Sequence, residues 1–344
     1  MKKICLFIIF SLPFALWQCS KIDQGNKTLK ESLQESSTAI NNAVASISGS
    51  KGFDLLSLTE DGVKSDMDFH DSINLDLIAG VYDFSPAPEL HPVFFFPYRF
   101  FKKTGESENL EINLPEQLVF HPKRLHFFVL ADSDLENNFN ITATDYHFYY
   151  TWWNNYNYKL DAAFTLDTED IGNMSMSSVW NSFSSHNYQN QYNFPEGYSL
   201  IRTGMTGDTA RYEFALAQDN DTLLKETLMF TGDGFKRREK QYNLKIGDVE
   251  IRKGTGIDSI QVWFGGVLQQ KAGAKIMNND DYNASLFSRR DILLTFDDGT
   301  QTKLSDLIAP SLETLRGLSR SLDEMYFSKR IVDYIAFNIY YNRQ

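Results

Sequence analysis

The sequence predicts a mainly β protein, an antiparallel sandwich or an open barrel, with a helix near the N-terminus and a helical segment at the C-terminus. Three observations predict this class. Phe, Tyr and Trp make up 14% of the 344 residues, and aromatic rings favour the pleated surface of a sheet. Runs that alternate apolar and polar residues, joined by short turns, fill the middle of the chain. Apolar residues at spacings of three and four occur near both ends.

Two pairs of segments have the pattern of β-hairpins. Residues 211–216 alternate, turn through residues 218–221 and return through residues 223–230. Residues 291–296 and 300–304 flank Asp-Asp-Gly, which favours a tight hairpin turn. Short connections imply antiparallel pairing of the strands they join.

The same signals divide the chain into regions. We expect a β region over residues 51–165 and a β-hairpin region over residues 199–305. Between them, residues 166–198 are rich in Ser, Asn and Tyr and show no clear period. We therefore expect a long polar loop there, one that separates two β units or covers one of them.

Residues 28–50 predict an amphipathic helix, and residues 306–344 predict a C-terminal helical segment, although residues 331–340 fit both helix and strand. The apolar stripe of the first helix is Leu29, Leu33, Ile40, Ala43 and Ile47, and that of the second is Leu312, Leu315, Leu318, Leu322 and Met325. Isolated helices of this length are marginal in water. Two arrangements cover the stripes: the helices pack on each other, or the first helix pairs with another copy as a stalk.

The start of the chain has the pattern of a signal peptide. Met1, Lys2 and Lys3 precede an apolar run that is too short to span a membrane, so we assign residues 1–18 to a signal peptide and residues 19–27 to a tether. Cleavage of the signal peptide would remove two lysines and take the net charge from −12 to −14. Such a charge repels phosphate backbones and argues against nucleic-acid binding.

The residues before the second cysteine carry a resemblance. Leu16-Trp17-Gln18-Cys19 resembles the lipobox of bacterial lipoproteins, and the Asn-, Tyr- and Phe-rich body is similar to exported proteins of the Bacteroidota. The resemblance implies acylation of Cys19, export, and attachment to the cell envelope at the outer membrane. Cys5 would leave with the signal peptide, so the mature chain would keep one cysteine and no internal disulfide.

One aromatic segment is a candidate ligand site. Aromatic rings stack on sugars and amides bond to sugar hydroxyls, so Tyr149, Trp152, Trp153, Asn154 and Tyr156 suit a glycan. The same residues also suit a strand that is buried on one face and has a tyrosine-rich outer face, and this is the interpretation we favour.

Two acidic segments are weak metal-site candidates. They contain Asp66, Asp68 and His70, and Asp132, Asp134 and Glu136. Ordinary solvated acidic surfaces explain both better. We find no cofactor motif and expect no cofactor.

These observations predict a lipid-anchored protein of the cell envelope that acts by binding, adhesion or assembly and not by catalysis. Its expected partners are the membrane, through the lipid, and a glycan or an envelope protein. The alternative is a glycan-binding or glycan-hydrolysing surface protein, which would need two carboxyl groups about 5–9.5 Å apart across a cleft.

Overall fold

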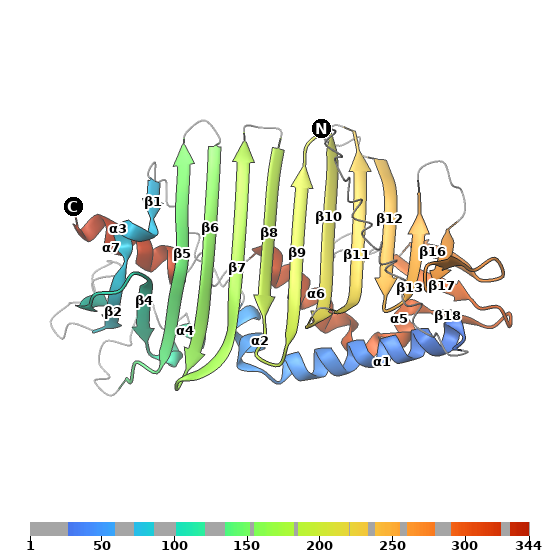
Figure 1. Cartoon of the computed structure of the whole chain (residues 1–344), viewed down its shortest axis with the longest axis horizontal. Coiled ribbons are helices and arrows are strands. Elements are labelled where there is room, and N and C mark those ends of the chain that lie inside the picture. The colour runs from blue at the N-terminus through green and yellow to red at the C-terminus, as the bar shows by residue number, and fades with distance from the viewer. Residues whose placement is uncertain are drawn as a thin grey trace, which may run out of the picture.

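The computed structural model describes residues 27–58, 72–85, 101–120, 135–151, 155–181, 185–219, 221–232, 238–254, 260–278, 290–324 and 331–343. It confirms the predicted mainly β class with a helix near the N-terminus and helices at the C-terminus. One 15-stranded sheet dominates the molecule, and a 3-stranded sheet lies beyond one of its ends (Figure 1). The large sheet stays open and does not close into a barrel.

The large sheet is built almost entirely from antiparallel neighbours. Its strand order is β15-β14-β13-β12-β11-β10-β9-β8-β7-β6-β5-β4-β2-β3, with β1 paired to β5, and only β2 and β4 run parallel. The strands are β1 (Ser72–Asn74), β2 (Gly80–Phe84), β3 (Phe101–Gly105), β4 (Leu110–Leu114), β5 (Phe139–Thr151), β6 (Asn155–Leu166), β7 (Glu169–Asn181), β8 (Ser185–Asn193), β9 (Tyr198–Thr206), β10 (Thr209–Gln218), β11 (Asp221–Thr231), β12 (Arg238–Ile246), β13 (Val249–Lys253), β14 (Gln261–Phe264) and β15 (Val267–Leu268). The small sheet contains β16 (Gly273–Asn278), β17 (Arg290–Thr295) and β18 (Gln301–Lys303).

Both predicted hairpins are present, as β10–β11 and as β17–β18. The predicted polar loop over residues 166–198 is wrong, because β7 and β8 occupy most of that segment and lie in the middle of the sheet. The alternation typical of a strand was hard to recognise in the sequence, because both faces of β7 and β8 carry polar residues. Met174, Met176 and Tyr192 are buried, whereas the residues between them are Ser, Asn and Gln.

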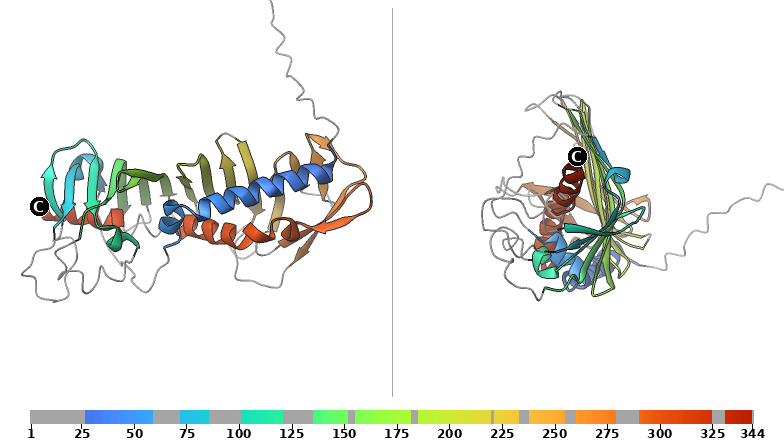
Figure 2. Two further views of the ribbon diagram at one scale, coloured as in Figure 1. Left: turned by 90° about the horizontal axis from the view of Figure 1, so that it is seen from below. Right: turned by 90° about the vertical axis from the view of Figure 1, so that its left-hand side faces the viewer.

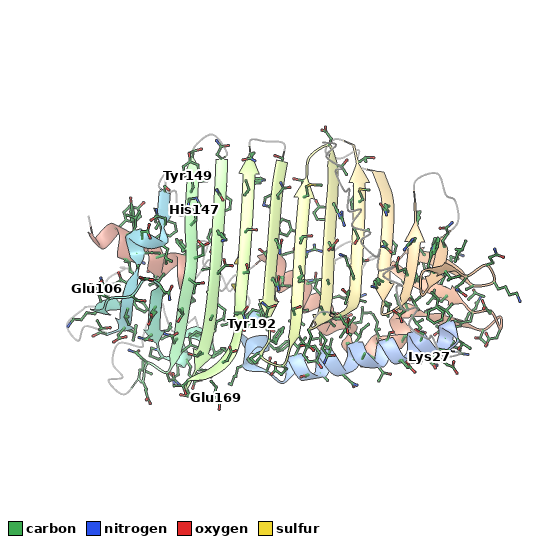
Figure 3. All side chains as sticks on the ribbon, in the orientation of Figure 1. Lys27, Glu106, His147, Tyr149, Glu169 and Tyr192 are labelled. Carbon is green, nitrogen blue, oxygen red and sulfur yellow. The ribbon has the colours of Figure 1, made fainter. Side chains whose placement is uncertain are left out.

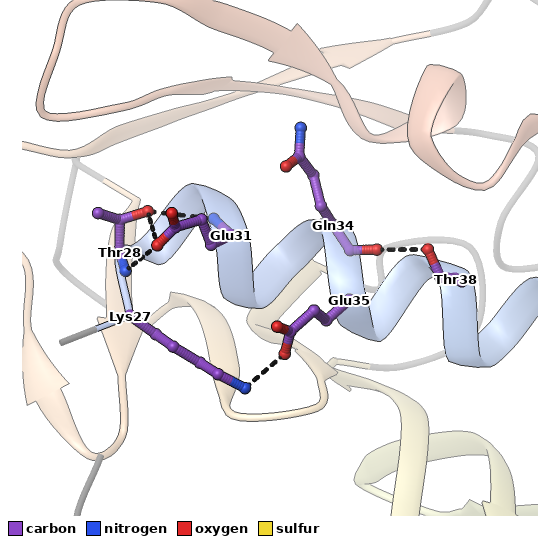
Figure 4. A network of polar contacts seen from close by, with 6 residues as sticks. All are labelled: Lys27, Thr28, Glu31, Gln34, Glu35 and Thr38. Atoms are coloured by element: carbon purple, nitrogen blue, oxygen red, sulfur yellow. Dashed lines mark hydrogen bonds and ion pairs between the residues drawn. The ribbon is translucent and has the colours of Figure 1, made fainter. Parts of the chain in front are cut away.

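The helices are α1 (Leu29–Ser48), α2 (Lys51–Leu56), α3 (Leu75–Ile78), α4 (Glu116–Phe120), α5 (Leu304–Leu307), α6 (Ala309–Glu324) and α7 (Asp333–Arg343). A capping box starts α1: Thr28 Oγ1 accepts from the Glu31 N–H, and the Glu31 carboxylate accepts from the Thr28 N–H (Figure 4). Thr28 also holds the pKa of Glu31 below its ordinary value through these hydrogen bonds. Residues 331–340, which fit both helix and strand templates, lie mostly in α7.

The helices cover one face of the large sheet and form the second layer of the molecule (Figure 2). Helix α1 packs beside α6 and across β11, β12 and β13, while α6 lies on β8 and β9. Leu33, Ile40 and Ile47 of α1 are at most 1% exposed. The stripe of α1 is therefore covered within one chain. None of the described helices is long and apolar enough to span a bilayer.

A buried carboxylate, Asp333, and an exposed one, Asp323, fasten the C-terminal helices to the sheet. Asp333, at the start of α7, accepts hydrogen bonds from the hydroxyls of Tyr146 (3.2 Å) and Tyr158 (2.9 Å). Asp323 of α6 forms a two-pronged ion pair with Arg202 of β9, at 2.6 and 2.9 Å. Burial, followed by the nearby charge of Asp333, raises the pKa of Tyr158 well above its ordinary value. Polar contacts thus set the position of each helix over an otherwise apolar core.

Candidate functional site

The face of the sheet opposite the helices has a distinctive composition. Alternate residues of β5–β13 are buried under the helices, and the residues between them point to this open face. On β7 and β8 the open face carries ten side chains, and none of them is charged. We call these ten the neutral strip: Asn173, Ser175, Ser177, Val179, Asn181, Ser185, Asn187, Gln189, Gln191 and Asn193.

Apart from Val179, the strip is a ladder of amides and hydroxyls with a fixed register. Asn173 pairs with Asn193, Ser177 with Gln189, and Asn181 with Ser185 across the two strands. Five positions on each strand, at about 6.7 Å between same-face neighbours, give a strip about 27 Å long. Strand spacing makes its two rows roughly 4.8 Å apart.

One end of the strip is ordered by its own hydrogen bonds. The Asn193 amide donates to Asn173 Oδ1 at 2.7 Å, and the Gln191 amide donates to Asn193 Oδ1 at 2.7 Å. Ser175 donates to Asp161 Oδ1 at 2.5 Å. Asn187 and Gln189 are exposed, and their side chains make no hydrogen bond to any other described residue. The middle of the strip therefore offers donors and acceptors to a ligand, held on a rigid sheet.

Charged groups flank the strip on both sides, and each group contains charges of both signs. On the β5–β6 side, Lys159 contacts the carboxylates of Asp145 and Asp161. The hydrogen bond and charge of Asp145 are the main reason that the pKa of Lys159 lies above its ordinary value. Between this group and β10 lie β7, β8 and β9, whose open-face positions are uncharged. The centre of the face thus carries no charged side chain of its own.

The flank on the other side contains Glu213, Lys225 and Arg211. Lys225 lies 2.6 Å and Arg211 3.1 Å from the Glu213 carboxylate. Burial alone would raise the pKa of Glu213, but Lys225 and then Arg211 bring it below its ordinary value. Glu213 is therefore ionised at neutral pH and already paired.

The helix-covered face of β7 and β8 carries an aromatic cluster. Trp180 is 49% exposed, and its ring lies 5.3 Å from that of His186, which lies 5.3 Å from that of Tyr188. Ser178 Oγ is 2.9 Å from His186 Nε2. A serine–histidine pair also needs N–H donors that would stabilise an oxyanion. Here the pair lies on strands whose backbone N–H groups belong to sheet ladders, so the geometry indicates a structural contact.

The structure separates the two described residues of the predicted aromatic site. Tyr149, labelled with His147 in Figure 3, lies on the open face of β5 and is 38% exposed. Tyr156 lies on the helix-covered face, stacked on Tyr158 at 6.1 Å, so the two tyrosines cannot contact one ligand surface. The other three predicted residues, Trp152, Trp153 and Asn154, lie outside the described residues.

The predicted metal candidates are placed only in part. Glu136 is described and exposed, whereas Asp66, Asp68, His70, Asp132 and Asp134 lie outside the described residues, as does Cys19. Within the described part of the chain, no three His, Cys, Asp or Glu side chains are grouped so that they could hold a metal ion.

Sequence reasoning missed the neutral strip because it assigned residues 166–198 to a loop. The signal was present in the alternation of Met174, Met176 and Ser178 with Asn and Ser, and of Tyr188, Asn190 and Tyr192 with Gln and Asn. Comparisons with known proteins give no further assignment: no protein-family model, no curated protein and no solved structure matches this chain.

Proposed function

We propose that this protein is a non-catalytic binding protein of the cell envelope, anchored by lipid on Cys19, which holds a neutral glycan on the neutral strip. The observation that carries the proposal is the ten-residue strip itself, which is uncharged over about 27 Å and has five exposed and five half-buried positions. An ordinary designed or natural surface carries roughly 25–35% charged residues, so ten neutral positions in two adjacent rows are unusual.

The chemistry of the strip matches sugar hydroxyls. A hydroxyl both donates and accepts, and the amides of Asn187 and Gln189 offer both functions on one side chain. A charged ligand would find no residue of opposite charge among these ten residues. The net charge of −12 also disfavours anionic polymers.

The absence of carboxylates in the strip supports binding without hydrolysis. Glycoside hydrolysis requires two carboxyl groups on either side of the scissile bond. The nearest acidic residue on this face of β6 is Asp161, which accepts from Ser175 and lies 3.4 Å from Lys159. A carboxylate that is already paired in this way is a poor general acid.

The envelope location rests on the first nineteen residues. The lipobox-like Leu16-Trp17-Gln18-Cys19 and the short apolar run before it support acylation of Cys19 after export. A lipid-anchored protein with a neutral binding face suits capture or adhesion at the outer membrane.

The experiment is a comparison of matched charge insertions. The soluble chain from Ser20 is titrated with neutral polysaccharides such as dextran and xylan, with heparin and DNA as anionic comparisons. We expect binding to a neutral polymer, and we expect Gln189→Glu to weaken it several-fold by placing a charge in the strip.

Gln241→Glu is the matched control, because Gln241 is exposed on the same face of β12 but lies outside the strip. Equal losses for the two variants would place the binding elsewhere. Binding of heparin alone would contradict a neutral-glycan site.

A further inference from the structure

The hairpin formed by β14 and β15 has a tip made entirely of apolar residues and glycine. The segment from Gln261 to Gln270 reads Gln-Val-Trp-Phe-Gly-Gly-Val-Leu-Gln-Gln and contains no charged residue. We call its six central residues the hairpin tip: Trp263, Phe264, Gly265, Gly266, Val267 and Leu268. Hairpin ends in water are ordinarily polar, so this composition calls for a physical reason.

The hairpin tip is exposed and its shape is fixed. Val267 is 63% and Leu268 38% exposed. Gly265 and Gly266 have φ of 55° and 79°, the left-handed values that a two-residue hairpin turn requires. Trp263 pairs with Leu268 and Phe264 with Val267 across the turn. Two apolar pairs are thus held together at the far end of a short, rigid ribbon.

Direct contacts place the hairpin tip beside the start of the described chain. The Gly265 N–H donates to the carbonyl of Asp248 at 3.1 Å. Gly247, next to Asp248, packs against α1, because a Cβ added there would lie 2.2 Å from Ser36 Oγ. Glu35, the neighbour of Ser36, accepts a hydrogen bond from Lys27 at 2.6 Å. Figure 4 shows Lys27 reaching Glu35 beside the capping box of α1. Lys27 and the hairpin tip therefore lie at the same end of the sheet.

The length of chain before Lys27 limits where a lipid on Cys19 can be. Lys27 is eight residue steps after Cys19, and a fully extended chain of eight steps spans at most about 29 Å. A bilayer that holds the acyl chains of Cys19 must therefore pass close to this end of the molecule. The exposed apolar residues of the hairpin tip are then at the end of the protein that faces lipid.

We infer that the hairpin tip rests in the interfacial layer of the membrane that holds the Cys19 lipid. This inference rests on the lipid anchor of the proposed function and is independent of the glycan. Trp is favoured at the membrane interface because its ring is apolar and its N–H is polar. Arg252, which is ion-paired with Glu250, lies 4.7 Å from the centre of the Trp263 ring, so charged groups border the apolar hairpin tip. The lipid and the hairpin tip together would fix the tilt of the sheet, as a second membrane contact does for singly anchored proteins.

The test uses the full-length acylated protein in vesicles of phosphatidylethanolamine and phosphatidylglycerol. Cys5 lies in the predicted signal peptide and the sulfur of Cys19 carries lipid, so Val267→Cys would provide one reactive thiol for an environment-sensitive fluorophore. Gln189→Cys, exposed on β8, is the matched control. Leu268→Cys repeats the measurement if the first variant does not fold.

At position 267 we expect blue-shifted emission, and quenching by lipids with a nitroxide near the headgroup that is several-fold stronger than at position 189. A label at 267 that remains as open to aqueous iodide as the label at 189, in protein that sediments with the vesicles, overturns the inference. Protein that does not sediment with vesicles refutes the lipid anchor and this inference together. A blue shift at 267 in the lipid-free chain from Ser20 assigns the hairpin tip to a protein contact and also overturns it.

Discussion

Ile40→Asp tests how the N-terminal helix is stabilised. Ile40 is 0% exposed and lies on the face of α1 that packs toward α6 and the sheet. Full burial of an isoleucine contributes about 1.5–3 kcal/mol, and truncation adds a cavity term that brings typical losses to about 2–5 kcal/mol. A carboxylate in that position has no cationic partner among its α1 neighbours Leu33, Ala43 and Ile47. We therefore expect a loss of about 4 kcal/mol or more, a large fraction of the roughly 5–15 kcal/mol that stabilises a typical fold.

Urea unfolding of the chain from Ser20, followed by circular dichroism, measures this loss, and size-exclusion chromatography reports the oligomeric state. Thr38→Asp is the control, because Thr38 is exposed on the same helix and receives the same charge. We expect Thr38→Asp to change stability by about 0.5 kcal/mol or less, and neither variant to change the elution volume. If Ile40→Asp turned an oligomer into a monomer with little loss of stability, α1 would be an intermolecular stalk and the reasoning would be wrong.

Four further outcomes follow from the contacts described above. Asp333→Ala leaves the buried hydroxyls of its tyrosine partners without an acceptor and should cost about 1–3 kcal/mol for each, measured by urea unfolding. Stability should be constant up to pH ~10 and fall as the pH rises further, because unfolded tyrosines ionise near pH ~10 whereas burial raises the pKa of Tyr158; urea midpoints from pH 8 to 11 would show it. Gly204→Ala should destabilise by about 1–3 kcal/mol, because the added Cβ would lie 2.0 Å from Tyr188 Cε1, and thermal unfolding would reveal a smaller effect if the ring moves freely. Cys19→Ala should move the protein out of the membrane fraction or leave it unprocessed, as seen by fractionation and intact mass.

The parts of the fold that the sequence predicts are those in which one face is apolar and the other polar. The stripe of α1 recurs at the helical period, and all five of its residues are buried. The β10–β11 hairpin has alternating residues and an Asp-rich turn, and it forms with the expected antiparallel pairing. In both cases the buried residues are mainly Leu, Ile and Phe, and their spacing fits only one type of local structure.

The centre of the sheet could not be recognised in this way. On β8 the side chains under the helices are His186, Tyr188, Asn190 and Tyr192, so both faces of the strand contain polar atoms. Asn190 is tolerated there because its amide donates to the carbonyl of Leu322 at 2.6 Å, a contact from a helix more than a hundred residues later in the chain. A partner so distant cannot be inferred from local pattern.

The candidate surfaces were hidden for a related reason. Each residue of the neutral strip is unremarkable alone, and the strip exists only because the register aligns two strands. The hairpin tip has a clear composition, but its significance comes from contacts that connect it to α1: the Gly265 N–H bonds to Asp248, and the adjacent Gly247 packs against Ser36. Both surfaces are properties of tertiary contacts and not of a motif.

The strand order affects how cooperatively the molecule folds and unfolds. From β4 to β15 every strand lies next to its neighbour in sequence, so most of the sheet is a one-dimensional stack of locally connected units. Such stacks tend to lose all-or-none behaviour, because each unit contacts only its neighbours and the ends fray first. Helix α1 counters this tendency, since it crosses β11, β12 and β13 and contacts α6 from the opposite end of the chain. The part of the stack beneath α1 and α6 should therefore exchange its amide hydrogens as one cooperative unit, while the β2–β3 end opens independently and faster.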